Sequence, residues 1–399
     1  MLHKIIAGAL ALGLSATAAA SIANAADKVK IGVITTLTTP AAVLGEEQMN
    51  GINLAMENLG GKMGGLPVEI IAEDDGFKPD IGKQKADKLV DQDNVDIVTG
   101  IIWSNTLLAV KKPILDAGKF LIGANAGTSN VAGAECDPNF FSTSWQNDMV
   151  PKALGEVLNQ RGVKSVYVMA PNYAAGKDMV AGVKSSFKGE VKGEDFTKWG
   201  KEAQLDFSAE LAKAKASGAE AMFVFYPGKA GGAFLKQFGQ AGLVGKMQFY
   251  NVFTIDGLSL PKLQAANMEG VVDALDTMQW SPDLDNEANK KFVSQYRAKH
   301  QRYPSFYAAQ AYDAINLINS AVVETGGKVE DKDAFRAALK KANYDSVRGK
   351  YTYGNNHFPV QNYYLRKVVV GDDGQWTFKT EATVYEMTGD DHAKDCPMK

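Results

Sequence analysis

Residues 95–124 read VDIVTGIIWSNTLLAVKKPILDAGKFLIGA, and this stretch decides the fold class. The apolar run at 95–102 predicts a buried strand, the periodic run at 104–117 predicts a helix, and the short run at 120–124 predicts the next strand. A strand, a helix and a second strand within about thirty residues are typical of a parallel βαβ unit.

The same alternation continues in both directions along the chain. Strands are predicted at 29–34, 68–72, 165–170, 221–226, 247–253, 270–275, 363–370 and 377–387, and helices at 45–59, 79–92, 149–161, 174–187, 229–241, 286–300, 305–325 and 332–342. The chain therefore contains two similar α/β series, followed by a helical stretch and a few strands.

Two α/β series predict two doubly wound lobes with the chain crossing between them. We assign residues 26–147 and 277–356 to an N-terminal lobe, and residues 148–276 and 357–399 to a C-terminal lobe. Open parallel sheets bind ligands at the carboxyl ends of their strands. The functional site is therefore expected in a cleft between the lobes, in the loops that follow the strands.

Composition and charge exclude several classes of protein. The chain has 399 residues, of which 45% are hydrophobic and 22% charged, so it is globular rather than disordered. The 43 Lys and Arg and 46 Asp and Glu give a net charge of −3, and no basic run is interleaved with aromatic residues. Nucleic acid is therefore not expected as a partner.

The N-terminal residues 1–25 predict a secretory signal peptide. Lys4 gives a positive start, an apolar segment follows, and Ala23-Asn24-Ala25 forms an A-x-A processing site. A membrane anchor is the alternative, but the apolar segment is shorter than the roughly 20 residues that a span needs. We expect an exported, periplasmic protein.

Export also makes a prediction about the two cysteines, Cys136 and Cys396. Pairing is the usual fate of two cysteines in an oxidising compartment, so we expect one disulfide that ties the chain's end to its body. Two unpaired thiols are the alternative.

Catalytic signatures are scarce. The sequence contains no phosphate-binding P-loop, no G-x-G-x-x-G fingerprint, no G-x-S-x-G elbow and no H-E-x-x-H pair. After the signal peptide only His300, His357 and His392 remain, without ligand spacing, so neither a metal nor another cofactor is expected. A triad assembled from distant residues stays open, but we expect no enzyme.

Several loops that follow predicted strands carry candidate binding residues. Ser104, after Trp103, can serve as an N-cap while it leaves its hydroxyl and nearby amides for a carboxylate; capping alone is the alternative. The loop at 124–129 has small residues that let a ligand approach the backbone. Later loops deliver aromatic or charged side chains to the same edge: Tyr173, Tyr226, Phe253 and Asp256.

These residues carry a resemblance to a known family. The opening Val29-Lys30-Ile31-Gly32-Val33, the Gly100-x-x-x-Ser104 loop, the Ala126-Gly127-Thr128 loop and the helical Ala311-Tyr312-Asp313-Ala314 resemble the leucine/isoleucine/valine-type substrate-binding proteins of ABC importers. The resemblance implies a type I periplasmic binding fold, with two α/β lobes, a three-segment hinge and closure around a small solute that is handed to membrane permease subunits.

The resemblance also implies roles for single residues. Ser104, Ala126 and Thr128, with their neighbour Asn125, are expected to hold a ligand carboxylate, and Tyr226 and Asp256 an ammonium group. Trp103, Trp145, Tyr173 and Phe253 are expected to form aromatic walls, although Ala174 replaces the glycine that usually follows the tyrosine in the family.

The ligand class is left between two alternatives. Asp256 stands where amino-acid binders commonly have Glu, and the aromatic residues suit a flat ring, so an aromatic acid of the benzoate or hydroxycinnamate type is favoured. A branched-chain amino acid is the main alternative, and a periplasmic enzyme or a sensory receptor are further ones. The protein is expected to be a monomer.

Overall fold

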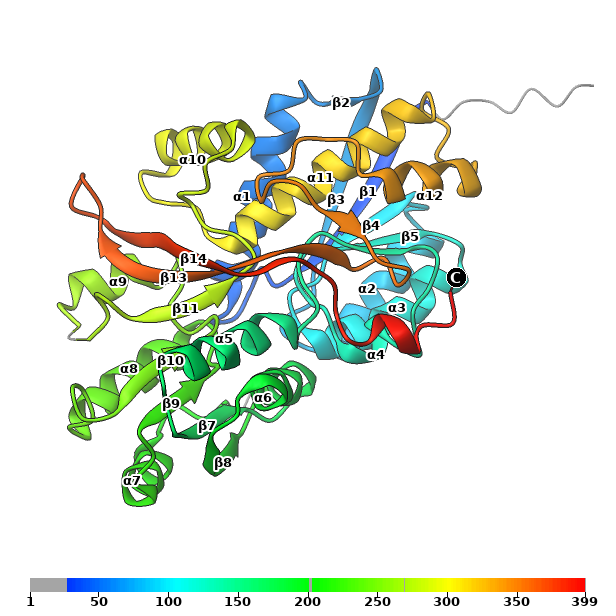
Figure 1. Cartoon of the computed structure of the whole chain (residues 1–399). Helices are drawn as coiled ribbons and strands as arrows, with labels where there is room; N and C mark the ends of the chain where they lie inside the picture. The colour runs from blue at the N-terminus through cyan, green and yellow to red at the C-terminus, as the bar shows by residue number, and fades with distance from the viewer. Residues whose placement is uncertain (1–26, 201–202, 269, 399) are drawn as a thin grey trace, which may run out of the picture.

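The computed structural model describes residues 27–200, 203–268 and 270–398. The predicted signal peptide lies outside the described residues. The described chain forms two mixed α/β sheets, which confirms the predicted two-lobed class (Figure 1).

The first sheet has six strands in the order β2-β3-β1-β4-β5-β6. All its neighbours pair in parallel except the short hairpin of β2 with β3. The strands are β1 (Val29–Thr35), β2 (Lys62–Met63), β3 (Leu66–Asp74), β4 (Ile97–Gly100), β5 (Phe120–Gly123) and β6 (Phe140–Ser142).

Helices cover both faces of this sheet because its strands are apolar on both sides. On one face, α1 packs against α11, and on the other α2 packs against α3. The bounds are α1 (Ala42–Asn58), α2 (Pro79–Asp91), α3 (Ser104–Asp116), α4 (Ser129–Ala132), α10 (Glu287–His300), α11 (Phe306–Glu324) and α12 (Lys332–Lys341).

The second sheet has the order β12-β13-β11-β10-β9-β7-β8, with β14 beside β13. Strands β7 to β11 pair in parallel, and β13 pairs antiparallel with β11, β12 and β14. The strands are β7 (Ser165–Pro171), β8 (Glu190–Thr197), β9 (Ala221–Val224), β10 (Gln248–Asn251), β11 (Leu275–Met278), β12 (Thr352–Tyr353), β13 (Pro359–Val370) and β14 (Trp376–Thr388).

The helices of the second lobe are α5 (Met149–Gln160), α6 (Ala174–Ser186), α7 (Ser208–Ser217), α8 (Lys229–Gln240) and α9 (Leu260–Ala265). The chain passes between the sheets after β6, after β11 and after α12. The lobe limits given above stay a proposal.

Two differences from the predicted elements have local causes. The strand predicted at 270–275 lies instead at Leu275–Met278, because Gly270 and Asp273 have positive φ values of 75° and 70° that no strand accommodates. Strand β8 and helix α7 were not predicted. Strand β8 is an edge strand whose residues are largely exposed or half-buried, so it has no apolar run to detect.

The chain's end returns to the first lobe. After β14, the short helix η2 (Ala393–Asp395) leads to Cys396, which forms a disulfide with Cys136, so the predicted bond is confirmed. Figure 1 shows this red segment beside α3 and α4. The disulfide therefore ties the end of the second sheet's last hairpin to the first lobe.

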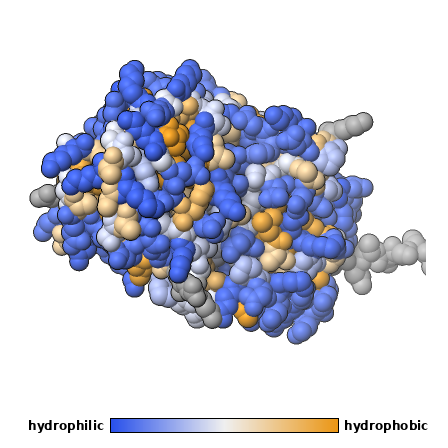
Figure 2. Space-filling view, turned by 90° about the horizontal axis from the view of Figure 1, so that it is seen from below, coloured by the Kyte–Doolittle hydropathy of each residue, from blue (hydrophilic) through white to orange (hydrophobic). Residues whose placement is uncertain are grey.

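The surface gives little sign of a broad apolar contact area on the face seen from below. Figure 2 shows a predominantly hydrophilic face with small, separate hydrophobic spots. Among the described helices, none is long and apolar enough to cross a membrane.

Candidate functional site

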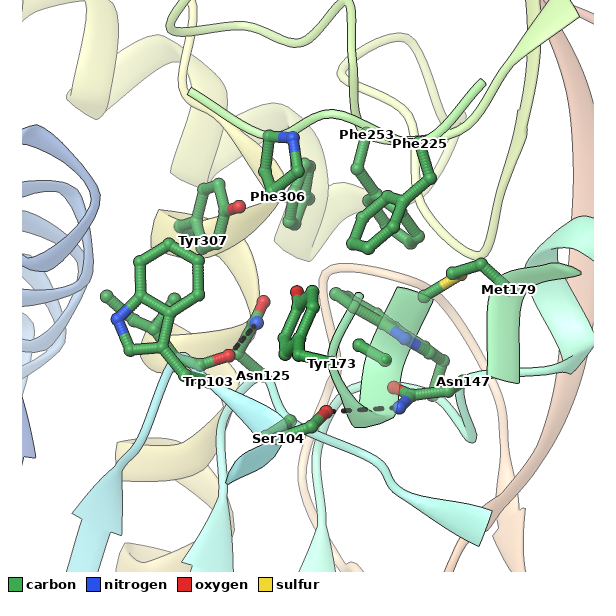
Figure 3. A pocket seen from close by; sticks show the side chains of 15 residues that line it. Trp103, Ser104, Asn125, Asn147, Tyr173, Met179, Phe225, Phe253, Phe306 and Tyr307 are labelled. Atoms are coloured by element: carbon green, nitrogen blue, oxygen red, sulfur yellow. Dashed lines mark hydrogen bonds between the residues drawn. The ribbon is translucent and has the colours of Figure 1, made fainter. Parts of the chain in front are cut away.

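A narrow cavity lies where the two sheets face each other. It is lined by the loops that follow β4, β5, β7, β9 and β10, by the passage after β6, and by the start of α11. Its lining residues are Ile102, Trp103, Ser104, Asn125, Ala126, Trp145, Asn147, Tyr173, Ala175, Met179, Phe225, Pro227, Phe253, Phe306 and Tyr307 (Figure 3).

The first loop of the cavity owes its shape to Gly100. This residue has a φ of 97°, and a Cβ placed there would lie 2.4 Å from the carbonyl oxygen of Ile34, so only glycine fits. The chain then turns so that Trp103 becomes the N-cap and α3 begins at Ser104. The indole Nε1 of Trp103 donates to Thr36 Oγ1 at 2.8 Å, which fixes the ring.

Ser104 is therefore not the N-cap, contrary to the prediction. The N-cap residue Trp103 makes no side-chain capping bond, and Ser104 is the first residue of α3. Its hydroxyl oxygen instead accepts a hydrogen bond from Asn147 Nδ2 at 3.1 Å (Figure 3). Since the oxygen is an acceptor in that bond, the hydroxyl hydrogen can point toward a ligand.

Asn147 organises this polar corner. Its Oδ1 accepts from the Gly127 amide at 3.2 Å, and its Nδ2 donates to Ser104 Oγ and, at 2.9 Å, to Asp178 Oδ2. Gly127 must be glycine, since an added Cβ would lie 2.0 Å from the Trp145 carbonyl oxygen. Together with the amides of the first two residues of α3, the corner offers hydrogen-bond donors suited to a carboxylate.

Asp178 joins the two lobes at this corner. It lies on α6 of the second lobe and accepts from the Ser129 amide at 3.3 Å and the Ser129 hydroxyl at 2.9 Å, at the start of α4 in the first. Burial, with a smaller contribution from nearby Asp148, raises the pKa of Asp178, although the hydrogen bonds from Asn147 and Ser129 oppose this.

The walls of the cavity are aromatic and come from both lobes. Trp145 stacks on Phe253 with ring centroids 4.6 Å apart, and Phe306 stands edge-on to both, at 5.6 and 5.2 Å. Phe225 is edge-on to Phe253 at 5.9 Å, and Tyr173 lies 6.2 Å from Phe225. Such an arrangement suits a flat ring, which gains from stacked and edge-on neighbours.

A second aromatic group closes the mouth of the cavity. Trp199, just after β8, stacks on Tyr173 with centroids 4.4 Å apart and meets Phe77 and Trp103 of the first lobe edge-on, both at 5.3 Å. Beside it lies a wider hollow, whose lining shares Trp103 and Pro227 with the cavity. The lobes are thus in contact around the site.

Three polar atoms of the lining have no hydrogen-bond partner among the described residues. Burial raises the pKa of Tyr173 and of Tyr307, so both hydroxyls are protonated at neutral pH, and no hydrogen bond contributes to either shift. Trp145 is 3% exposed, and its Nε1 is buried without an acceptor. In Figure 3, Tyr307 lies with Phe306 and Phe253 on the side of the cavity away from Ser104 and Asn147.

Seven of the ten predicted ligand-binding residues line the cavity, and three do not. The seven are Trp103, Ser104, Asn125, Ala126, Trp145, Tyr173 and Phe253. Asn125 is also fixed from two sides, because its Nδ2 donates to the Ile102 carbonyl at 2.7 Å and its Oδ1 accepts from Gln310 Nε2 at 2.6 Å.

The other three predicted residues have partners elsewhere. The hydroxyl of Tyr226 accepts from Thr197 Oγ1 at 3.1 Å, and its ring stacks on Phe234. Thr128 caps α4 by accepting from the Val131 amide.

Asp256, the third, is turned into its own loop. Its Oδ1 accepts from the amides of Leu258 and Ser259 at 3.0 and 2.7 Å. Burial raises the pKa of Asp256 to about 6, although these hydrogen bonds lower it. Asp256 is not among the lining residues, although its charge acts on Tyr307, which lines the cavity.

The remaining lining residues were not among the predicted site residues. Phe225 and Pro227 flank the predicted Tyr226, and Asn147 lies two residues after the predicted Trp145. The sequence therefore identified these two loops but not these three residues. Met179 lies inside α6, and Phe306 and Tyr307 at the start of α11. Met179 lies less than two helical turns after the predicted Tyr173, whereas no sequence signal brings the start of α11 to the same cavity.

Among the described residues, no group of His, Cys, Asp or Glu side chains could hold a metal ion. The lining also has no Asp, Glu, Lys or Arg within the described ranges. The cavity can therefore bind a ligand through hydrogen bonds and aromatic contacts.

The pattern of a family described as a periplasmic binding protein matches residues 28–375. Leu/Ile/Val-binding protein homolog 6 of Brucella abortus is 30% identical over 393 residues, which covers 95% of this chain and 98% of that relative.

Two solved structures are also similar. The first is an ABC transporter solute-binding protein from R. palustris in complex with benzoate, with a TM-score of 0.85, 28% identity, and coverage of 93% of this chain and 100% of that one. The second, from Rhodopseudomonas palustris BisB5 in complex with 3,4-dihydroxybenzoic acid, has a TM-score of 0.83 and 29% identity, and covers 92% and 99% of the two chains.

Proposed function

Since the chain belongs to the periplasmic binding protein family, and is a non-enzymatic solute-binding protein of an ABC transporter with the type I fold, we propose that its ligand is an aromatic carboxylate. Benzoates and hydroxycinnamates are the compounds that we have in mind. The protein captures the acid in the periplasm as a monomer, closes its lobes around it and delivers it to the permease subunits in the inner membrane.

The observation that carries this proposal is the absence of charged side chains from the described lining of the cavity. An amino acid would bring an ammonium group as well as a carboxylate. An ammonium buried without a counter-ion costs several kcal/mol. Asp256, the expected partner for that ammonium, has its Oδ1 bonded within its own loop and does not line the cavity.

The carboxylate end is assigned to Ser104. Its hydroxyl and the first-turn amides of α3 would donate to the ligand, while Asn147 orients the hydroxyl from behind. Asn125 and Ala126 form the floor beside this corner, and the three remaining predicted residues, Thr128, Tyr226 and Asp256, are assigned to support of the loops.

The ring lies between the aromatic walls. Trp145 and Phe253 provide a stacked pair, and Trp103, Tyr173 and Phe225 are the other rings that we assign to ligand contact. Each offset or edge-on pair of rings adds about 0.5 to 1.5 kcal/mol beyond the burial of area. This term favours an aromatic acid over an aliphatic one of the same size.

Hydrogen-bond donors of the described lining that have no partner favour a ligand with a hydroxyl group on its ring. A buried N–H group without a partner costs about 1 to 3 kcal/mol, and Trp145 Nε1 is such a group. No hydrogen bond contributes to the pKa of Tyr173 or Tyr307, so their hydroxyls can also donate to a ligand. A hydroxyl on the ring supplies an acceptor to one or more of them. The two similar solute-binding proteins described above hold benzoate and a dihydroxybenzoic acid, which agrees with this ligand class.

A branched-chain amino acid is the second candidate. It is favoured by the 30% identity to Leu/Ile/Val-binding protein homolog 6 and by the apolar Ile102 and Met179 in the lining. Against it stands the lack of an acidic residue for the ammonium among the described residues that line the cavity. A role in sensing would use the same site with a receptor in place of the permease.

The experiment that separates these ligands is a thermal-shift screen followed by calorimetric titration. The mature protein is tested against benzoate, 4-hydroxybenzoate, hydroxycinnamates and the twenty amino acids. A ligand at about 100 times its Kd stabilises the protein by about 2.7 kcal/mol, a shift that is easily detected. Shifts with aromatic acids alone support the proposal, whereas a shift with leucine, isoleucine or valine and none with the aromatic acids refutes it.

A further inference from the structure

The C-terminal tail, residues 389–398, places a histidine beside the polar corner of the cavity. His392 Nε2 lies 2.5 Å from Asp148 Oδ2, at the start of α5. The tail is held there by the Cys136–Cys396 disulfide and by Lys152, which pairs with Asp391 at 2.5 Å. The position of His392 is therefore fixed from both ends of the tail.

From His392, a short line of contacts leads to Ser104. Asp148 packs against Gly182 of α6, one helical turn after Asp178, and Asp178 accepts from Asn147 Nδ2 at 2.9 Å. The same Nδ2 donates to Ser104 Oγ at 3.1 Å. Two carboxylates thus lie behind the corner to which we assign the ligand's carboxylate.

These charges create a problem for an anionic ligand. Like charges disfavour one another in a poorly solvated region, and the described lining of the cavity contains no Lys or Arg to offset them. The titratable groups around His392 are those of Asp148, Lys152, Asp178, Asp390, Asp391 and Asp395. Lys152 is paired with Asp391, which leaves His392 as the cation that faces Asp148.

We propose that His392 is a positioning residue for ligand binding: its positive charge holds Asp148 and offsets the carboxylates behind Ser104, so that an anion can be bound there. His392 does not contact the ligand. This inference rests on the proposed carboxylate site at Ser104, and it extends that proposal to the tail, whose disulfide then serves binding as well as stability.

The direction of the pH effect follows from the contacts. The hydrogen bond to Asp148 is the largest cause that raises the pKa of His392, and the charges of Asp148, Asp390 and Asp178 add to it. His392 therefore keeps its charge to a higher pH than an ordinary histidine and loses it as the pH rises through this raised pKa. Anion affinity falls over the same range. The pKa of Asp178 is also raised, so this carboxyl gains its negative charge, and weakens anion binding further, as the pH rises through a lower range.

The test is the Kd of benzoate, measured by calorimetry between about pH 6 and pH 8.5, where benzoate itself does not titrate. A unit charge roughly 10 Å from the ligand, at an effective dielectric constant between about 20 and 80, changes affinity by roughly 2- to 16-fold. We expect the wild type to lose this factor as the pH rises. The His392→Gln variant should bind benzoate weakly, with the same Kd at every pH in this range. The His392→Lys variant should bind benzoate tightly throughout.

Two controls separate charge from folding. Benzamide, which is neutral, should bind with no pH dependence in each variant, and His300→Gln, which changes a histidine far from the tail, should behave as the wild type. A His392→Gln protein that keeps the wild-type pH dependence for benzoate overturns the proposal. Loss of benzamide binding in His392→Gln would also overturn it, because that variant would then have lost the site's shape.

The experiment distinguishes a wrong ligand class from a wrong role for His392. If the wild type does not bind benzoate, isoleucine supplies the carboxylate for the same comparison of variants. A second measurement needs no ligand. The pKa of His392, measured by NMR titration, should be lower in Asp148→Asn than in the wild type. A His392 that titrates identically with and without Asp148 overturns the proposal whatever the ligand.

Discussion

Phe225 and Tyr226 are consecutive residues that face opposite sides of the second sheet. Phe225 lines the cavity and stands edge-on to Phe253 at 5.9 Å. Tyr226 packs on the other side, against Phe207 and Phe234, with its hydroxyl bonded to Thr197. The alternation of side chains along an extended chain produces this division.

The pair provides a matched test of the site. Phe225→Leu should weaken an aromatic acid by about 0.5 to 1.5 kcal/mol, because one ring contact is replaced by an aliphatic one. Tyr226→Phe should leave the affinity unchanged and lower the free energy of unfolding by about 0.5 to 1.5 kcal/mol, through loss of the bond to Thr197. Calorimetric titration and denaturant unfolding measure the two quantities, and the reverse pattern would contradict the assignment.

Ser104→Ala should weaken carboxylate ligands by about 1.5 to 3 kcal/mol, the usual range for a hydrogen bond to a charged group. The Kd of 4-hydroxybenzoate, measured by calorimetry, checks this. Asn105→Ala is the matched control, since the Asn105 side chain bonds the neighbouring Thr106 amide and does not line the cavity. Equal affinities of the Ser104→Ala and wild-type proteins would exclude Ser104 from the carboxylate site.

Tyr307→Phe and Tyr173→Phe should distinguish ligands with and without a ring hydroxyl. In at least one of the two variants, the advantage of 4-hydroxybenzoate over benzoate in binding free energy should shrink by about 0.5 to 1.5 kcal/mol, because a neutral hydrogen bond is lost. The ratio of the two Kd values measures this difference. Tyr303→Phe, which alters a tyrosine outside the cavity, is the control. Unchanged ratios in both variants would remove these hydroxyls from recognition.

Asp256 should make stability depend on pH. Its pKa is about 6 in the folded protein, raised mainly by burial from an ordinary value of 3.8. The folded state therefore holds the proton more tightly than the unfolded state, and the free energy of unfolding falls as the pH rises through this window.

The difference of about 2 pKa units corresponds to about 3 kcal/mol. Part of this effect develops below pH 4, where the unfolded carboxyl already ionises. Relative to the wild type, the free energy of unfolding of Asp256→Asn should thus rise by about 2 kcal/mol between about pH 4 and pH 7, measured by denaturant unfolding at both pH values. A constant difference between the two proteins would show that Asp256 has an ordinary pKa. Its affinity for an aromatic acid should be largely unchanged, whereas binding of an amino acid would be lost if Asp256 were the ammonium partner.

The disulfide should contribute to stability through its long loop, because Cys136 and Cys396 are 260 positions apart. Replacing both with serine should lower the free energy of unfolding by about 2 to 4 kcal/mol. Denaturant unfolding checks this, with the reduced wild type as a control that should match the double variant. An unchanged unfolding midpoint would show that the tail is held by its ion pairs alone.

Much of the architecture follows from local patterns. The helices beginning near Pro79, Ser104 and Met149 end within a residue of their predicted bounds, because each buries an apolar face that repeats every three to four residues. Where that signal is weak, prediction failed: β8 at Glu190–Thr197 is an edge strand with polar residues on both faces.

The sequence by itself determined which loops form the site, because the carboxyl ends of parallel strands meet at one edge of a sheet. It did not determine which residue of each loop enters the cavity. One step along the chain reverses a side chain's direction, as Phe225 and Tyr226 show, and the capping bonds of Thr128 and Asp256 turn these two away.

Only the tertiary structure decided the rest. Asn147, Met179 and Tyr307 reach the cavity because the two lobes and α11 converge on it, and His392 reaches Asp148 because the tail crosses back to the first lobe. Such contacts depend on how distant segments pack, and periodicity carries no information about that packing.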